Sequence, residues 1–355
     1  MAAAKQVVGL KLGAASVRAA CLAVNGSAEL LHVAEGLLPP GAVAGGEVRD
    51  EAALAAALSD FFKRNKLPRR NVRLGVANNR IGVRTIDIAG IDDPQQLANA
   101  VRFRAQEALP IPLDQAVLDF QVVSEGVDAE GAPSKRILLV VAYRDLIDAY
   151  TRVCRQAGLR LVGVDLEAFA LLRALAPGAK TAAAERSALV AVSIGADRTV
   201  LAVSDGETCD FTRVLEWGGN ALTGTLAASL GLDPEEVERV KTSLALDDES
   251  VPEGLTAERA AQGRAALRQG LQAFGRELIS SLQFYQGQPD SLGIREVVIA
   301  GGTARLRGLA AQLESLVGVP VRVGDPLAGV AVGKKLKGGV PDAAHTVAIG
   351  LGMGI

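Results

Sequence analysis

The sequence predicts an α/β fold of two lobes, each with a β-sheet flanked by helices. Apolar strand patterns alternate with helical patterns along the 355 residues, which is typical of sheets covered by helices. A similar hairpin pattern occurs once in each half of the chain, and a strand–helix–strand–strand–helix unit lies between the two. Hydrophobic residues make up 49% of the chain, enough for a substantial core.

Composition argues against several classes of protein. Lys and Arg number 38 against 40 Asp and Glu, whereas a nucleic-acid-binding protein usually carries a basic excess. None of the 3 cysteines lies in a close pair, so neither a disulfide framework nor a zinc ribbon is expected. The start MAAAKQ lacks the apolar stretch of a signal peptide, and the run ILLVVAY is too short to span a bilayer. We therefore expect a cytoplasmic protein that does not insert into a membrane.

Two hairpin patterns carry the main functional signal. The first, VGLKLGAASVRAACLAVNG, alternates apolar residues up to Gly13, and the second, VAVSIGADRTVLAVSDG, does so up to Gly195. Period-two alternation broken by glycine predicts a hairpin, and exposed amides in a tight turn can hold an anion. Each hairpin alone is an ordinary structural element. The pair, in matching order, indicates a duplicated architecture that could grip a polyphosphate from both sides.

The elements between the hairpins follow in a regular order. A helix is expected over about 51–65, followed by the strand VRLGVA. Next come the strand VRTIDI, a helix capped by Asp93, the strands AVLDFQVV and RILLVVAY, and a helix over about 145–156. These last five elements form a compact unit that we expect to be an inserted subdomain. The stretch RLVGVDLEAFALLRAL then predicts a strand that leads into a helix.

The second half adds helices and a third glycine-rich turn. Helices are expected over 221–230, over DPEEVERVK and over about 257–285. The stretch EVVIAGGTARLRGL predicts a buried strand, a Gly-Gly-Thr turn and the start of a helix, and ligands collect at such carboxyl ends of strands. GVPVRV predicts a short strand, and the chain ends in small residues.

Familiar catalytic motifs are absent from the sequence. GVAVGKK has the wrong spacing for a P-loop, and GGTARLRG is not a dinucleotide fingerprint. Neither a G-x-S-x-G nor an H-E-x-x-H motif occurs, so these four enzyme classes find no support.

Several long stretches resemble the PilM family of type IV pilus assembly proteins, a branch of the actin-like ATPase superfamily that includes actin, sugar kinases and FtsA. The resemblance runs almost end to end. Among the stretches that carry it are VVGLKLGAASVRAA, VRLGVANNRIGVRTIDI and DDPQQLANAVRFRAQEALPIPLDQAVLDFQVV. It implies an actin-like ATPase fold with a cleft for ATP or ADP between two lobes. It also implies a membrane partner, PilN, whose short cytoplasmic N-terminal segment lies in a groove beside the inserted subdomain.

The resemblance further implies the limits of the subdomains. Subdomain 1A, with the first hairpin, takes residues 1–80 and 160–185, and the inserted 1C-type subdomain takes residues 81–159. Subdomain 2A, with the second hairpin and the Gly-Gly-Thr turn, takes residues 186–230 and 294–355. Residues 231–293 form the helical subdomain 2B.

A set of nucleotide-binding residues is likewise implied by the resemblance. Two phosphate turns, a pair that approaches the nucleoside and an adenosine turn contribute to it. In chain order these residues are Gly13, Ala14, Ala15, Ser16 and Arg18, then Gly195, Ala196, Thr199 and Gly219, then Glu238 and Lys241, and finally Gly301, Gly302 and Thr303.

Two positions depart from the family pattern. Hairpins of the family usually carry D-I-G, with the acids holding water on Mg²⁺, whereas this chain has Lys11 and Ser193 there. Because Mg²⁺ relies on one or two carboxylates, its site is weakened, no metal ligand is assigned, and the residues argue against hydrolysis of bound ATP. Lys11 either supplies a fixed positive charge to a phosphate or marks a cleft no longer selected for hydrolysis, and both interpretations stay open. Asp165, Glu167 and Asp197 are the nearest remaining acids in the sequence.

The main functional hypothesis is a nucleotide-binding scaffold of type IV pilus assembly that docks the N-terminal segment of a PilN-like inner-membrane protein. Such a scaffold would lie on the cytoplasmic face of the inner membrane through its partner. The inserted subdomain favours this hypothesis, because kinases of the superfamily lack it. The alternatives are an active ATPase or phosphotransferase of the same fold and an FtsA-like filament or division protein, and assembly into a homo-oligomer or filament stays open.

Overall fold

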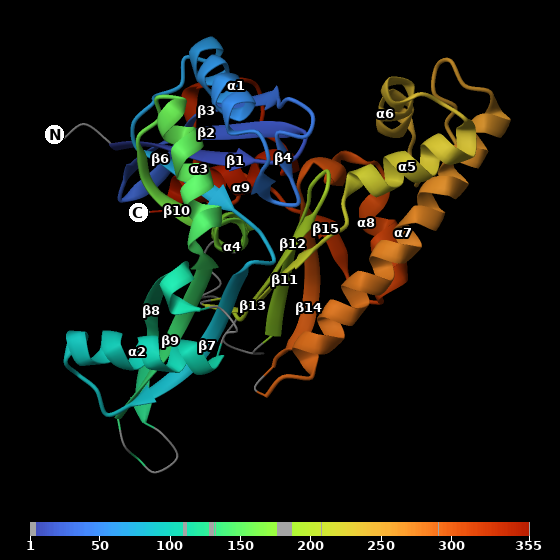
Figure 1. The fold of residues 1–355 in the computed structure, drawn as a ribbon. Helices are drawn as coiled ribbons and strands as arrows, with labels where there is room; N and C mark the ends of the chain where they lie inside the picture. Colours follow the sequence, from blue (N-terminus) through green and yellow to red (C-terminus); the bar gives the residue numbers. More distant parts are fainter. Residues whose placement is uncertain are drawn as a thin grey trace.

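The computed structural model describes residues 5–108, 112–127, 131, 133–175, 187–206, 208–289 and 291–354. Residues 109–111, within a family-typical stretch, and residues 176–186, at the end of the range predicted for subdomain 1A, lie outside the described part. Figure 1 shows two lobes side by side and a smaller subdomain that extends below the first lobe. Within the described residues, no helix is long and apolar enough to cross a membrane.

The first lobe is built on a six-stranded sheet in the order β10-β6-β1-β2-β3-β16. Its strands β1 and β2 form the first predicted hairpin, and β6 and β10 extend the sheet in parallel. Helices α1 and α3 cover one face, where Phe61, Phe62 and Tyr150 are buried. The elements are β1 (Lys5–Leu12), β2 (Ser16–Asn25), β3 (Ser27–Leu37), the small hairpin β4 (Val43–Ala44) and β5 (Glu47–Val48), α1 (Glu51–Arg64), β6 (Val72–Val76), α3 (Arg144–Gln156), β10 (Leu161–Leu166), α4 (Glu167–Leu175), β16 (Ala331–Lys337), η4 (Ala343–His345) and α9 (Thr346–Met353).

The second lobe holds a five-stranded sheet in the order β13-β12-β11-β14-β15. Alternate residues of these strands face opposite sides. One side packs against helices α5 to α8, and the other packs against α4 and α9, which lie between the two sheets. The elements are β11 (Ser187–Ile194), β12 (Thr199–Ser204), β13 (Cys209–Leu215), α5 (Gly219–Leu230), α6 (Pro234–Ser243), α7 (Ala257–Gln286), β14 (Gly293–Ala300), η3 (Gly302–Arg305), α8 (Leu309–Val317) and β15 (Val321–Val323).

The inserted subdomain has the predicted order of elements and a small core of its own. Asp93 caps its helix, because its Oδ1 accepts hydrogen bonds from the amides of Gln95 and Gln96. The sheet order β7-β9-β8 leaves β8 at an edge. The elements are β7 (Ile81–Ala89), α2 (Pro94–Ala108), η1 (Leu113–Gln115), β8 (Ala116–Val127) and β9 (Pro133–Tyr143).

The C-terminal small residues form a helix, α9, that the sequence pattern did not predict. This helix is buried all round, from Thr346 to Gly352, so it has no amphipathic period to detect. It lies so close to β1 that a Cβ on Gly9 would lie 2.0 Å from the Ala348 carbonyl oxygen. Strand β16 pairs with β3. Thus β16 joins the first sheet and α9 packs on it, although both fall within the range 294–355 predicted for the second lobe.

Candidate functional site

The two predicted hairpins close in the same way. The Gly13 amide donates to the Ser16 carbonyl oxygen at 2.9 Å, and the Gly195 amide donates to the Arg198 carbonyl oxygen at 2.9 Å. Both turns line a single cavity of about 30 Å³, which we call the hairpin cavity. Its lining residues are Lys11, Gly13, Ala14, Ala15, Ser16, Arg18, Glu167, Ser193, Gly195, Ala196, Asp197, Arg198 and Val200. The structure therefore brings most of the predicted phosphate-turn residues together from both lobes.

Lys11 joins the two lobes at this cavity. Its side chain is 8% exposed, and its Nζ lies 3.2 Å from Glu167 Oε2 and 3.3 Å from Ser193 Oγ on the opposite lobe. Burial lowers the pKa of Lys11, Glu167 opposes that shift, and the nearby charges of Arg18 and Arg198 lower the pKa further. The ammonium thus has one anionic partner but lies within a group of cations.

Three glycine segments meet at the end of β11. The Gly219 amide donates to the Gly195 carbonyl oxygen at 2.9 Å, and Thr303 Oγ1 donates to the same oxygen at 3.0 Å. Gly301 has φ of 91°, and a Cβ there would lie 2.4 Å from the Ile194 carbonyl oxygen. Only glycine fits this position, both for its conformation and for the close approach of β11. The predicted adenosine turn therefore lies directly beside the second hairpin.

Arg18 connects the first hairpin to this turn. Its Nη2 lies 3.2 Å from the point where a Cβ on Gly302 would be, and it pairs with Glu35 at 2.5 Å. Glu35 also pairs with Arg305 of η3 at 2.8 Å, and Arg305 pairs with Asp342 at 2.6 Å. Burial would raise the pKa of Glu35, but Arg305 and Arg18 hold it below its usual value. This chain of ion pairs links β3 of the first lobe to η3 of the second.

Some predicted site residues lie outside the cavity. Thr199 is fully buried, and its hydroxyl donates to the Trp217 carbonyl oxygen at 2.8 Å, so it offers nothing to a ligand. Glu238 and Lys241 pair with each other at 2.7 Å on α6, and Lys241 also donates to Thr223 Oγ1 of α5 at 2.7 Å. None of these three lines the hairpin cavity.

Arg198 is a site residue that the sequence analysis missed. Its side chain is buried beside the β4–β5 hairpin, where a Cβ on Gly46 would lie 2.0 Å from Arg198 Nη1. The neighbouring Asp197 accepts a hydrogen bond from the Gly45 amide at 2.9 Å. The signal was available in the sequence, because a charged pair follows Gly195 and Ala196 inside the predicted phosphate turn.

The remaining acids do not assemble a magnesium site. Glu167 pairs with Lys11, Asp197 is used by a backbone amide, and Asp165 pairs with Arg173 at 3.1 Å outside the cavity. Among the described residues, no group of three or more His, Cys, Asp or Glu side chains could hold a metal ion. Mg²⁺ is usually held by one or two carboxylates together with phosphates and water. The two carboxylates that line the cavity are already engaged by the Lys11 ammonium and the Gly45 amide, so in this arrangement they do not fit the ion.

A larger hollow of about 630 Å³, the edge groove, lies between the first lobe and the inserted subdomain. Two sheet edges border it, since in the part of the chain that the structure describes β8 pairs only with β9 and β10 only with β6. Apolar side chains share its lining with two arginines and two aspartates. The lining residues are Arg73, Val76, Val117, Asp119, Phe120, Gln121, Leu138, Val140, Ala142, Ile147, Gly163, Val164, Asp165, Leu166, Phe169 and Arg173.

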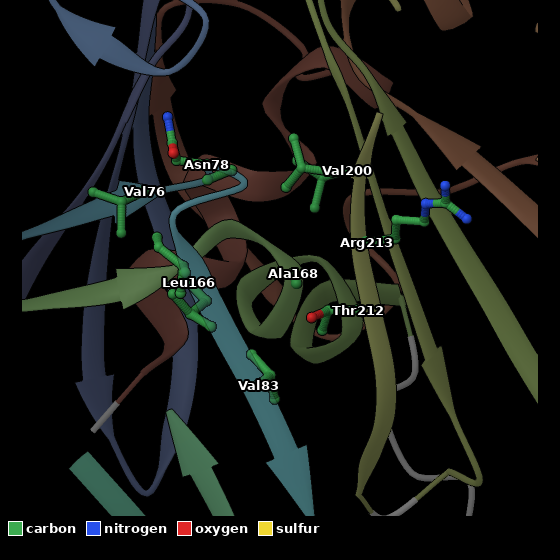
Figure 2. A pocket seen from close by; sticks show the side chains of 11 residues that line it. Val76, Asn78, Val83, Leu166, Ala168, Val200, Thr212 and Arg213 are labelled. Atoms are coloured by element: carbon green, nitrogen blue, oxygen red, sulfur yellow. The ribbon is translucent and has the colours of Figure 1, made fainter. Parts of the chain in front are cut away.

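A third pocket, which we call the junction pocket, has a volume of about 30 Å³ and lies where both lobes meet the inserted subdomain. Figure 2 shows Val76, Val83, Leu166, Ala168 and Val200 around it. Val200 also lines the hairpin cavity, and Val76 and Leu166 also line the edge groove. The junction pocket therefore shares lining residues with the hairpin cavity and with the edge groove.

Comparison with known proteins identifies the fold and a family. The family model for the type IV pilus assembly protein PilM matches residues 9–354. A solved PilM-PilN type IV pilus biogenesis complex aligns with a TM-score of 0.79 at 24% identity, covering 98% of both chains. MreB5 of Spiroplasma citri bound to ADP aligns with a TM-score of 0.55 at 14% identity, covering 98% of this chain and 94% of that chain. The predicted actin-like ATPase fold is confirmed.

A cell division protein is also similar to part of the chain. The cell division protein FtsA of Escherichia coli K12 is 24% identical over 258 residues, which are 67% of this chain. The chain spans 60% of the length of that relative.

Proposed function

The chain belongs to the PilM family of type IV pilus assembly proteins, and on this premise we propose that it is a nucleotide-binding scaffold that docks the cytoplasmic N-terminal segment of a PilN-like membrane protein. Through that partner it would lie on the cytoplasmic face of the inner membrane. One observation carries the proposal: the edge groove between two open sheet edges.

The backbone of the groove suits an extended segment. Edge strands present unpaired N–H and C=O groups, and a peptide can add to such an edge as a further strand. Strands β8 and β10 both offer these groups to the groove. At Gly163, in β10, an added Cβ would meet nothing within 4 Å, so a peptide backbone has room to approach.

The side chains of the groove indicate the chemistry of the segment. Val117, Leu138 and Val140 are partly buried and lie on the face of the inserted sheet that lines the groove, where apolar residues of a peptide could be buried further. Arg73 Nε is buried without a hydrogen-bond partner among the described residues. A carbonyl or carboxylate oxygen of the segment would satisfy it. We therefore expect an apolar, extended segment with an acceptor placed near Arg73.

The nucleotide belongs to the other site. We assign the phosphates of ATP or ADP to the two hairpin turns and the adenosine to the neighbourhood of Gly301–Thr303, as the family resemblance implies. A cavity of about 30 Å³ has room for about two water molecules. The hairpins must therefore move apart when a nucleotide enters.

Peptide binding tests the docking proposal. We expect Val140→Asp to weaken binding of a fluorescent peptide copying the N-terminal segment of the PilN-like partner by about tenfold or more, because a charge would face apolar peptide side chains. Fluorescence anisotropy gives the affinity. Val332→Asp is the matched control: Val332 is 48% exposed on β16, at the opposite edge of the same sheet from β10. Equal affinities for Val140→Asp and the unmodified chain would rule out the groove.

A further inference from the structure

Three cationic side chains line the hairpin cavity. They are Lys11, Arg18 and Arg198, and the carboxylates of Glu167 and Asp197 lie among them. Arg18 also pairs with Glu35, and Lys11 pairs with Glu167, so the formal charges around the cavity are close to balanced. Lys11 and Arg198 are each 6% exposed as whole residues, so solvent screens these two cations little. Buried cations of this kind attract the oxygens of an anion.

The cavity also has more hydrogen-bond donors than acceptors. Arg18 Nε is buried without a hydrogen-bond partner among the described residues. Arg198 Nη1 lacks a partner there as well, but it lies against Gly46 of the β4–β5 hairpin, which does not line the cavity. Buried donors are normally satisfied, and Asp197 is already engaged by the Gly45 amide. A ligand group with several anionic oxygens would accept hydrogen bonds from these donors.

Lys11 stands where a metal-holding acid would be needed. Its ammonium lies 3.3 Å from Ser193, so at the two hairpin positions the chain presents an ammonium and a hydroxyl that face each other. A lysine ammonium is a compact point charge with three donors. Two of its contacts are Glu167 and Ser193, which leaves a third donor for a phosphate oxygen when the lobes part.

We propose that this chain binds the phosphate groups of a nucleotide without a divalent metal, with Lys11 as the cation that neutralises them, supported by Arg18 and Arg198. The inference rests on the nucleotide site of the proposed function and deepens it. It concerns binding only, and it assigns no bond-breaking step to the site.

Calorimetric titration separates this inference from the proposed function. ADP and ATP are titrated into the full chain, once in EDTA and once in excess Mg²⁺. We expect the two dissociation constants for each nucleotide to differ by less than about threefold. Binding that requires Mg²⁺ would overturn the inference and leave the nucleotide site standing. Absence of binding in both buffers would overturn the nucleotide site itself, and the inference with it.

Variants identify the cation. We expect Lys11→Gln to weaken nucleotide binding in EDTA by about tenfold or more, which is the loss typical of one charge-assisted hydrogen bond. Lys334 is an exposed lysine on β16, and Lys334→Gln should leave the affinity unchanged. Because Lys11→Gln leaves Glu167 buried without its partner, Ser193→Asp serves as the second variant. Its carboxylate would pair with Lys11 and weaken nucleotide binding without unfolding the chain. Unchanged affinity in both variants would overturn the role of Lys11.

The metal alone provides a further readout. Mg²⁺ without nucleotide should leave the melting temperature of the unmodified chain unchanged. It should raise that of the chain carrying Lys11→Asp together with Ser193→Asp, because the two introduced carboxylates and Glu167 would then form an acidic group that a cation relieves. A rise for the unmodified chain would contradict the inference.

Discussion

At the scale of single residues, the environment of a charge decides what it does. Asp342 and Arg305 form one ion pair near the surface, whereas Lys11 and Glu167 form another in the interior. The first pair is screened by water and contributes little. Loss of one partner of the second would leave a buried charge uncompensated, which typically costs about 3–5 kcal/mol.

Asp342 gives the stability of the protein a pH dependence. Burial alone would raise its pKa, but Arg305 and the Ala344 amide lower it from 3.8 to about 2. A carboxyl with a lowered pKa in the folded state stabilises the fold above about pH 4 and loses that contribution as the pH falls toward 2. Because Asp342 is partly exposed, we expect this contribution to be at most about 1 kcal/mol. Urea titrations at pH 6 and pH 3 should show a smaller loss of stability for Asp342→Asn than for the unmodified chain, and parallel losses would contradict the assignment.

Gly9 leaves no room for a side chain between β1 and α9. We expect Gly9→Ala to lower the free energy of unfolding by about 1–3 kcal/mol or more, because its methyl group would push α9 away from β1. Gly224 in α5 is the matched control, since an added Cβ there meets nothing within 4 Å. Gly224→Ala should stabilise the helix by about 0.5–1 kcal/mol. Chemical denaturation measures both, and a Gly9→Ala chain as stable as the unmodified one would show that α9 can shift freely.

At the scale of elements, the second hairpin has a structural role besides lining the cavity. Its turn reaches across to the first lobe, where Asp197 accepts from the Gly45 amide and Arg198 is buried against Gly46. Tyr150 of α3 donates to the Gly46 carbonyl oxygen at 3.1 Å. The β4–β5 hairpin is therefore held between a helix of its own lobe and a turn of the other.

Hydrogen exchange can test this contact directly. In an Asp197→Ala chain the Gly45 amide loses its acceptor, and we expect its exchange to accelerate by about tenfold or more. Asp60→Ala is the control, because Asp60 lies exposed on α1 and pairs only with Arg64 in the described structure. Protection of Gly45 that is unchanged in Asp197→Ala would mean that another group holds the two hairpins together.

At the scale of the whole molecule, the sequence predicts what local patterns encode. The hairpins, the inserted unit and helix α1 were all predicted because alternation, glycine and capping residues are local signals. Helix α9 was not, since residues 346–352 are small or apolar on every side. The resemblance implied a groove beside the inserted subdomain but not the residues that line it, because that lining arises only when β8 and β10, far apart in the chain, come to border the same space.

The site was predictable to the same degree. Gly13, Gly195 and Gly301 were identified because glycine marks tight turns in a sequence, and in the structure the three turn segments lie close together. The role of Arg198 depends on what the other lobe places beside it, and the internal bond of Thr199 depends on Trp217. Such partners cannot be deduced from neighbours in the sequence.

The junction of β10 and α4 connects the lining of the edge groove to that of the hairpin cavity. Asp165 lines the edge groove, Leu166 lines both the groove and the junction pocket, and Glu167 lines the hairpin cavity. Three consecutive residues thus line three spaces, and we expect a ligand that shifts one of them to shift its neighbours. If a nucleotide changes the affinity for the partner by some factor, thermodynamic reciprocity requires the partner to change the affinity for the nucleotide by the same factor. Under the proposed function, the fraction of molecules that carry nucleotide would then change with the fraction bound to the membrane partner.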